Sequence, residues 1–274
     1  MIEIMFCGNH AVFDGMLICA LSILKRSNTT EPFRFHILTM DVSHIKPVYT
    51  PIKAEQEELF LRVIKSYNPE NELRVIDVTE LYREEFEGCP NENAYCSPYT
   101  VLRLLADRIE GMPDKLLYLD ADVMFNDDIR KLWDIEVSDV EYAAARDRYG
   151  RILVNPNYIN AGVLLFNLKC MKETEILTRA RALLRKKKLP FADQSALIRT
   201  TTKRRMLPSR FNHQKTLRKS TVIRHFSKRL FWLPFPHTEN IKQWHVERVR
   251  KVFGYRCFDD IFDEYISLKE EQKG

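Results

Sequence analysis

Hydrophobic and polar positions alternate along the chain in blocks that predict strands and helices in turn. Short apolar runs predict strands at residues 2–7, 33–40, 73–77, 116–119, 142–145, 162–168 and 221–226. Longer amphipathic segments predict helices at 13–25, 53–67, 97–109, 169–187, 193–200, 241–253 and 258–269, with Asp193 as the N-cap of its helix. Such alternation is typical of an α/β fold with a mostly parallel central sheet and helices on both faces.

Polar residues follow the ends of several predicted strands. In open α/β sheets, ligands bind beyond the carboxyl ends of the strands. We therefore expect one shared site from the residues at these ends: Cys7-Gly8-Asn9, Asp77, Asp120-Ala121-Asp122, Arg146-Asp147 and His225.

The segment Asp120-Ala121-Asp122 directly follows the apolar run 116–119. Side chains of an extended chain alternate between faces, so the two carboxylates point the same way. Two like charges held together are costly unless a cation lies between them, and a divalent metal is the natural candidate. Three interpretations stay open for this motif alone: a metal-bound nucleotide-sugar site, a phosphatase of the haloacid-dehalogenase class, or a turn whose carboxylates cap the next helix.

Composition favours one large globular domain, because 45% of the 274 residues are hydrophobic and no low-complexity tract occurs. Only eight glycines are present, and the sequence has no glycine-rich phosphate loop. The six cysteines are scattered without a C-x-x-C pair, which fits a reducing compartment. No apolar run is long enough to span a bilayer, and we expect a soluble, cytoplasmic protein.

Charge is distributed unevenly, although the net charge is only +5. No acidic residue occurs between Asp193 and Glu239. This basic block favours an anionic partner over the alternative of a plain solvated surface. No nucleic-acid-binding motif accompanies it, so we expect no nucleic acid. The block contains Lys203, Arg204, Arg205, Arg210, Lys215, Arg218, Lys219, Arg224, Lys228 and Arg229.

From Met1 to about Trp244, the chain resembles family 8 of the glycosyltransferases, the group of glycogenin and the bacterial lipopolysaccharide galactosyltransferases. The order and spacing of five blocks carry the resemblance: IMFCGNHAVFDGMLICALSIL, YLDADVMFNDDIRKLW, YINAGVLLFNL, ADQSAL and RHF. The resemblance implies a single Rossmann-like nucleotide-diphospho-sugar transferase domain of the GT-A type over residues 1–239. A helical C-terminal extension, 240–274, is then expected to pack on it.

The resemblance also implies a metal centre. Asp120, Asp122 and His225 match its ligands, a set that suits Mn²⁺ better than Mg²⁺. The metal would hold the diphosphate of a uridine diphosphate (UDP) hexose, with galactose or glucose as the sugar. Residues matching the donor site are Cys7 and Asn9 at the uracil, Arg103, Ala121, Asp147, Asn160 and Ala161 near sugar and phosphate, and Asp193 and Gln194 beside the anomeric carbon.

The chain departs from the family pattern at two places. The family tends to read D-Q-D, and Ser195 stands in the place of the second aspartate. In addition, no glycine follows His225 at the usual spacing. Lys242-Gln243-Trp244 is the candidate for a displaced Lys-Pro-Trp that binds the diphosphate, with Lys228 or Arg229 as the alternative. These departures leave a non-catalytic nucleotide-sugar-binding protein as the second hypothesis.

Members of the family retain the anomeric configuration of the sugar. Gln194 is a poor nucleophile, which favours attack from the face of the departing phosphate over a double displacement. The expected acceptor is a cell-envelope glycolipid or polysaccharide. The basic block and the apolar residues behind it indicate peripheral contact with an anionic membrane at its inner face, with core packing or a donor lid as alternatives. These apolar residues are Phe226, Leu230, Phe231, Trp232, Leu233 and Phe235.

Overall fold

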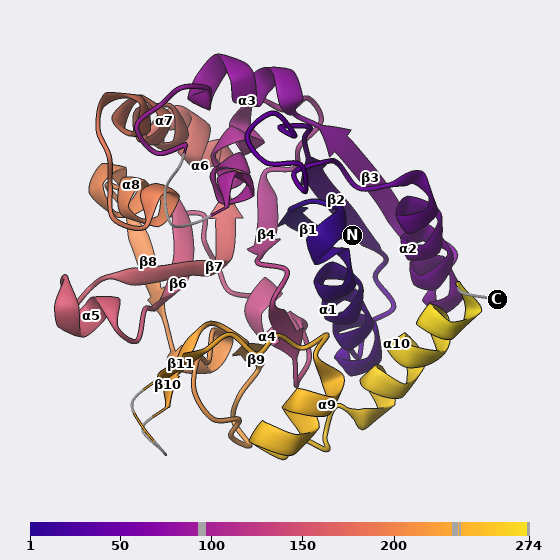
Figure 1. Ribbon diagram of the computed structural model, residues 1–274. Helices are drawn as coiled ribbons and strands as arrows, with labels where there is room; N and C mark the ends of the chain where they lie inside the picture. The colour runs from indigo at the N-terminus through magenta and orange to yellow at the C-terminus, as the bar shows by residue number, and fades with distance from the viewer. Residues whose placement is uncertain (93–96, 232–234, 236, 273–274) are drawn as a thin grey trace.

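The computed structural model, which describes residues 1–92, 97–231, 235 and 237–272, is built around a seven-stranded sheet (Figure 1). Its strand order is β3-β2-β1-β4-β7-β6-β8. All neighbours pair in parallel except at β7, which runs antiparallel to both β4 and β6. The predicted mostly parallel sheet is confirmed. Its strands are β1 (Ile2–Cys7), β2 (Phe33–Thr39), β3 (Glu72–Asp77), β4 (Lys115–Leu119), β6 (Tyr142–Arg146), β7 (Ile159–Asn167) and β8 (Arg204–Leu207).

Helices cover both faces of the sheet, as predicted, and bury two apolar clusters. The first cluster includes α1 (Phe13–Arg26), α2 (Ala54–Tyr67) and α10 (Asp259–Glu271). The second includes α3 (Thr79–Phe86), the 3₁₀ helix η2 (Pro98–Arg108), α6 (Leu168–Glu173), α7 (Ile176–Lys186) and α8 (Ala192–Thr200). Shorter helices are η1 (His10–Val12), α4 (Arg130–Trp133), α5 (Gly150–Leu153), η3 (Ser209–Phe211), α9 (Val246–Arg248) and η4 (Val249–Phe253).

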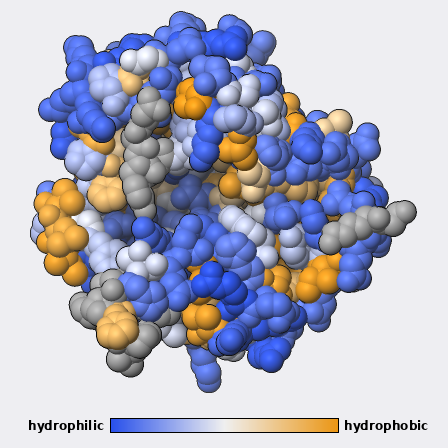
Figure 2. All heavy atoms as spheres, viewed as in Figure 1, coloured by the Kyte–Doolittle hydropathy of each residue, from blue (hydrophilic) through white to orange (hydrophobic). Residues whose placement is uncertain are grey.

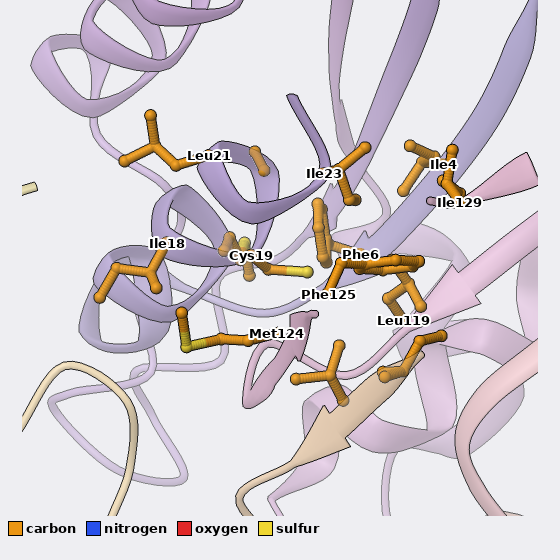
Figure 3. Packing of buried hydrophobic residues seen from close by; sticks show 14 of the residues in the cluster. Ile4, Phe6, Ile18, Cys19, Leu21, Ile23, Leu119, Met124, Phe125 and Ile129 are labelled. Carbon is orange, nitrogen blue, oxygen red and sulfur yellow. The ribbon is translucent and has the colours of Figure 1, made fainter. Parts of the chain in front are cut away.

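The core anchors the segment that carries the D-x-D motif (Figure 3). Leu119 at the end of β4 and Phe125 in β5 (Val123–Phe125) are both fully buried, and both pack in the cluster that contains Ile18 of α1. Each such side chain contributes about 1.5–3 kcal/mol when it is fully buried. The loop between Leu119 and Val123 is therefore held at both ends by packed core, which limits where its two carboxylates can point.

Two small antiparallel sheets lie outside the main one. The late strand predicted at 221–226 is the short β9 (Ile223–His225), and it pairs with β5 rather than with the main sheet. The second pair is β10 (Arg229–Phe231) with β11 (His237–Glu239).

Three helix predictions were wrong in detail. The segment 169–187 is two helices, because Glu175 adopts a left-handed φ of 52° that ends the first. Phe191, at a φ of 54°, precedes α8, so Asp193 lies inside the first turn and is not the N-cap. The predicted helix 241–253 begins only at Val246.

The C-terminal helix α10 lies along α1 at the edge of the molecule (Figure 1). Arg26 donates to Asp260 at 2.7 Å, and Lys269 donates to Asp14 at 3.1 Å. Within the described ranges, no helix is long and apolar enough to cross a bilayer. The division at residue 239 stays a prediction.

Candidate metal centre and active site

Three candidate metal ligands meet at the edge of the main sheet. The β5–β9 ladder sets His225 opposite Val123, and Phe226 N donates to Asp122 O at 2.8 Å. His225 Nε2 consequently lies 3.0 Å from Asp122 Oδ1 and 3.9 Å from Asp120 Oδ2. One ligand atom from each of Asp120, Asp122 and His225 lies within 4.8 Å of the others. Two carboxylates and an imidazole form a donor set that fits a divalent ion such as Mn²⁺.

A chain of hydrogen bonds orients the imidazole. Asp147 Oδ2 accepts from Asn160 Nδ2 at 2.8 Å, and Asn160 Oδ1 accepts from Asn212 Nδ2, also at 2.8 Å. Since the carboxylate only accepts, it fixes the orientation of both amides, and Asn212 Oδ1 faces His225 Nδ1 at 2.9 Å. Nδ1 therefore carries a proton, and Nε2 is the atom turned toward the two carboxylates. Asn212 was missed in the sequence, because a lone asparagine in a loop has no local signature.

Gly162 permits the close approach of β7 to this cluster. Its N–H donates to Asn160 Oδ1 at 3.0 Å, and its carbonyl accepts from Asp120 N at 2.8 Å. A Cβ at this position would lie 2.8 Å from Asp120 Oδ2 and closer still to His225. A glycine is needed here because the space is filled, and the backbone of β7 therefore lies directly against the candidate ligands.

Lys242 reaches the D-x-D motif from the C-terminal segment. Its Nζ donates to Asp122 and also to the Phe226 carbonyl, at 3.1 Å for the latter. Burial would raise the pKa of Asp122, but the charges of Lys242 and His225 outweigh it and hold this pKa well below its ordinary value. Asp122 is therefore a carboxylate at any physiological pH.

The two residues after Lys242 contact the loop that carries Asp120 and Asp122. Gln243 Nε2 donates to the Ala121 carbonyl at 2.6 Å. Gly15 of α1 lies against both this carbonyl and the Trp244 ring, with no room for a Cβ. Gln243, Gly15 and Trp244 thus fix the loop from outside, and the assignment of Lys242-Gln243-Trp244 as a displaced Lys-Pro-Trp stays a prediction.

Arg103 connects the motif to a second acid. Its side chain is 2% exposed and stacks on the Tyr118 ring, 4.1 Å from the ring centroid. It donates to Asp120 Oδ1 at 3.1 Å and to the Ala161 carbonyl, and its Nε lies 3.2 Å from Asp193 Oδ2. Arg103 therefore holds Asp120 and Asp193 in place, and its predicted contact with a donor stays a prediction.

The Asp-Gln pair faces the Asn160-Ala161 turn. Asp193 is 3% exposed, yet its Oδ2 accepts no hydrogen bond from any described residue. Burial raises the pKa of Asp193 by more than Arg103 lowers it. Gln194 Oε1 accepts from Ala161 N at 2.9 Å. A buried carboxylate oxygen that accepts no hydrogen bond, beside a fixed amide, is an arrangement suited to binding hydroxyl groups.

Ser195, the departure from the family pattern, has a structural role. Its hydroxyl bonds the Tyr158 hydroxyl at 2.8 Å and the Pro190 carbonyl. It holds the turn before α8 and is 4% exposed.

The remaining strand-end residues divide between the site and the scaffold. Cys7 is buried at the end of β1, and burial raises the pKa of its thiol, which disfavours a nucleophilic role at neutral pH. Asn9 Nδ2 donates to the Val48 carbonyl at 2.8 Å, so one of its groups is used within the protein. Asp77 accepts from Thr79 N at 2.8 Å at the start of α3 and belongs to the scaffold. The uracil contacts of Cys7 and Asn9 stay predictions.

The residues of the basic block and the apolar residues behind it differ in burial and in ion pairing. Arg224 and Phe226 are fully buried, and Phe226 is therefore core rather than membrane surface. Arg205 pairs with Asp139 at 3.0 Å. Phe235 is exposed, whereas Trp232 and Leu233 lie outside the described residues. Figure 2 shows that the face in view is hollowed near its centre, where hydrophilic atoms line the hollow.

The sequence matches a known family over most of its length. The model of glycosyl transferase family 8 matches residues 3–231. A putative glycosyltransferase of Haemophilus influenzae is 24% identical over 188 residues, 65% of this chain and 52% of the relative. The lipopolysaccharide 1,2-glucosyltransferase of Escherichia coli is 27% identical over 216 residues, 72% of this chain and 58% of the relative. The chain thus spans about half the length of these curated relatives.

Solved structures share the fold. The galactosyltransferase LgtC, in complex with donor and acceptor sugar analogues, has a TM-score of 0.66 at 21% identity, covering 95% of this chain and 100% of that one. The glycosyltransferase GlyE of Streptococcus pneumoniae has a TM-score of 0.61 at 20% identity, covering 97% of this chain and 64% of that one. The fold is therefore the GT-A fold expected from the sequence.

Proposed function

Because the chain belongs to glycosyltransferase family 8, we propose that it is a metal-dependent, retaining hexosyltransferase. It moves galactose or glucose from a UDP-sugar to a hydroxyl of an acceptor glycan. The observation that carries this proposal is the meeting of Asp120, Asp122 and His225, whose ligand atoms lie within 4.8 Å of one another. Lys242 lies against the same cluster and supplies a cation for a diphosphate.

Asp120, Asp122 and His225 would hold the metal, with Mn²⁺ favoured over Mg²⁺ because one ligand is an imidazole. A bound divalent ion supplies positive charge against the diphosphate of the donor. Hydrogen bonds within the protein hold a candidate ligand in position. Arg103 and Tyr118 hold Asp120 through hydrogen bonds of 3.1 and 2.6 Å.

The donor sugar lies, in this proposal, between the Asn160-Ala161 turn and α8. Asp193 Oδ2 accepts a hydrogen bond from a sugar hydroxyl, which gives this buried oxygen a hydrogen-bond donor in addition to its ion pair with Arg103. Gln194 Oε1 already accepts from Ala161 N, and its second lone pair stabilises positive charge that develops on the sugar ring.

Transfer proceeds by attack from the face of the leaving group. The bond between the anomeric carbon and the UDP oxygen breaks, and a bond from that carbon to the acceptor oxygen forms. The proton of the acceptor hydroxyl passes to the leaving phosphate. Gln194 is a neutral amide, so it serves as a stabilising group and not as a nucleophile.

The acceptor is a cell-envelope glycolipid or polysaccharide, a proposal supported by the name of the Escherichia coli relative. The enzyme would act in the cytoplasm, in peripheral contact with the inner face of an anionic membrane. Exposed Ile152, Leu153 and Val154 beside Arg151 at the tip of α5 are the described residues best suited to such contact.

The first test is calorimetric titration of UDP with and without Mn²⁺. Wild type should bind UDP only with the metal, and Asp122→Ala should lose this binding. Asp127→Ala, which removes a more exposed acid from the same region and leaves the cluster intact, is the matched control. No binding of UDP to wild type with Mn²⁺ would refute the donor assignment. Binding without any turnover of UDP-galactose or UDP-glucose would instead favour a non-catalytic nucleotide-sugar-binding protein.

A further inference from the structure

A basic cavity lies next to the candidate active site. It has a volume of about 480 Å³, within the range of small-molecule sites. Its charged lining comes from β6 and the segment that follows, and from the loop before β9. We call it the arginine pocket, and its basic residues are Arg146, Arg148, Arg151, His213, Lys215 and Arg218.

The arginine pocket has no countercharge of its own. Throughout the described part of the chain, no carboxylate lies within 4.0 Å of the cationic groups of Arg146, Arg148, Arg151, Lys215 and Arg218. Among the described residues, the acceptors of the Arg146 guanidinium are neutral groups, the Pro156 carbonyl and the Asn157 amide. Arg205, from the same basic block but outside the pocket, is paired with Asp139, so the lack of ion pairs is a feature of the pocket and not of the whole block. Like charges gathered in a concave site attract an anion.

The pKa of one pocket residue, His213, agrees with a concentration of positive charge in the pocket. His213 is half-buried, and its Nδ1 lies 3.0 Å from Thr221 Oγ1. Burial and the positive charges around it, Arg218 foremost, hold the pKa of His213 below its ordinary value. The imidazole is therefore neutral at pH 7, and the arginines and the lysine supply the charge.

The pocket shares a wall with the proposed sugar site. Asn212 lines the pocket and also accepts from His225 Nδ1 at 2.9 Å. Gln214, in the same wall, accepts from Arg148 N at 3.1 Å and lies 3.5 Å from Asp147 Oδ2. A ligand in the pocket is thus separated from the candidate metal centre by one layer of side chains.

The pocket does not suit the diphosphate of the donor. Lys242 meets the cluster at Asp122, whereas the pocket reaches the cluster through Asn212 and His225. An anion in the pocket would therefore lie on the side of Asp147 and Asn160, where the proposed function has the donor sugar and to which an acceptor hydroxyl must come.

We propose that the arginine pocket is an acceptor subsite that binds a phosphate or carboxylate group of an anionic acceptor glycan. The substrate class is then a negatively charged saccharide rather than a neutral one. This inference rests on the proposed transferase function. Arg148 and Arg218 are specificity-determining residues, since their guanidinium groups offer planar, paired donors to either anion.

A membrane surface is the competing source of negative charge. Ile152 and Leu153, 73% and 79% exposed, lie in α5 beside the pocket, and Figure 2 shows an apolar patch at the left edge where Figure 1 has α5. A concave pocket fits a discrete anionic group better than a flat layer of headgroups, and for this reason we favour the glycan.

The test uses the full chain saturated with Mn²⁺ and UDP, so that phosphate cannot enter the donor site. Glucose, glucose 6-phosphate and glucuronic acid are titrated by calorimetry. We expect at least one of the anionic sugars to bind about tenfold more tightly than glucose. Comparison of glucose 6-phosphate with glucuronic acid shows whether the pocket prefers a phosphate or a carboxylate. Arg148→Gln and Arg218→Gln should each remove most of this preference, and Arg205→Gln, outside the pocket, should keep it.

Three results would overturn the inference. One is equal affinity for glucose and both anionic sugars. Another is equal loss of affinity for all three sugars in the Arg148 and Arg218 variants. The last combines two observations on different ligands. Wild type would bind phosphatidylglycerol vesicles, and both variants would lose this binding. Wild type would at the same time show no preference among the three soluble sugars. Retained Mn²⁺-dependent UDP binding in the same samples separates failure of this inference from failure of the proposed function.

Discussion

The Lys242 ammonium donates a hydrogen bond to Asp122, a candidate metal ligand 120 positions away in the chain. The lysine therefore contacts a group that a metal would also need. A divalent ion must compete with the ammonium for this carboxylate, and a released ammonium lies close to the diphosphate that the metal would hold. Lys242 is for this reason favoured over Lys228 as the diphosphate-binding cation.

Lys242→Met should change two affinities in opposite directions. Mn²⁺ alone should bind more tightly, because Asp122 loses a competing partner. UDP in the presence of Mn²⁺ should bind about tenfold or more weakly, because a charge-assisted contact is lost. Calorimetry measures both, with Lys228→Met as the comparison that should change neither. A loss of UDP affinity confined to Lys228→Met would reverse the assignment.

Asn212→Leu should weaken Mn²⁺ binding by about 10- to 100-fold, the usual effect of removing the partner of a ligating histidine. The variant removes the acceptor that keeps the proton on His225 Nδ1. Asn212→Asp retains an acceptor there and should lose much less. Manganese titration followed by electron paramagnetic resonance gives both values. If the two variants bind equally, the hydrogen bond to Nδ1 does not tune the ligand.

Gly162→Ala should abolish metal binding without unfolding the protein. The added methyl group would overlap the His225 ring and press on Asp120 Oδ2, both of which must move. Gly254→Ala is the control with the opposite profile. Gly254 has a φ of 65° and open space around it, so this variant should lose about 1–2 kcal/mol of stability and keep its metal affinity. Thermal unfolding and Mn²⁺ titration of the two variants separate the effects, and normal metal affinity in Gly162→Ala would contradict the packing argument.

Asp193→Asn should be more stable than wild type at neutral pH, although less active. In the folded protein burial raises the pKa of Asp193 above its unfolded value, so ionisation costs stability once the pH exceeds that unfolded value of about 4. The stability difference, variant minus wild type, should therefore grow from pH 4 to pH 7. Urea unfolding in a metal chelator measures it. A difference that shrinks as the pH rises would mean that attraction to Arg103 outweighs burial.

Much of the scaffold was predictable because it depends on local pattern. The strand 2–7 was predicted with the bounds that β1 has, and β4 begins only one residue earlier than predicted. The break between α6 and α7 was not predictable, since the basic amphipathic pattern continues through Glu175, and no glycine or asparagine marks its left-handed φ of 52°. Local pattern likewise suggested Asp193 as an N-cap, whereas the buried Arg103 draws its carboxylate inward.

The candidate site was predictable only in part, for a related reason. Asp120 and Asp122 are separated by one residue in the turn between β4 and β5, so their proximity follows from chain geometry. The approach of His225 depends on the pairing of β5 with β9, a contact of long sequence separation that only the family resemblance suggested. Asn212 and the arginine pocket depend on folding of the loop before β9, and the basic composition indicated an anionic partner without indicating where it binds.

Gln194→Ala decides between the two routes to retention. If Gln194 stabilises positive charge on the sugar, its loss should lower kcat by about 10²-fold and leave UDP affinity unchanged, because the proposed function has this amide against the sugar and not against the nucleotide. If Gln194 were a nucleophile, the loss would be far larger, and a glycosylated enzyme would accumulate in wild type with a slow acceptor, visible by mass spectrometry. The first route is favoured because a neutral amide is a poor nucleophile, and the hydrogen bond of 2.9 Å from Ala161 N lowers the nucleophilicity of Gln194 Oε1 further. Ser195→Ala, which alters the neighbouring position on the scaffold side, is the control and should affect stability more than kcat. A Gln194→Ala enzyme with nearly wild-type kcat would remove this residue from the mechanism and leave the leaving phosphate and Asp193 as the groups to test next.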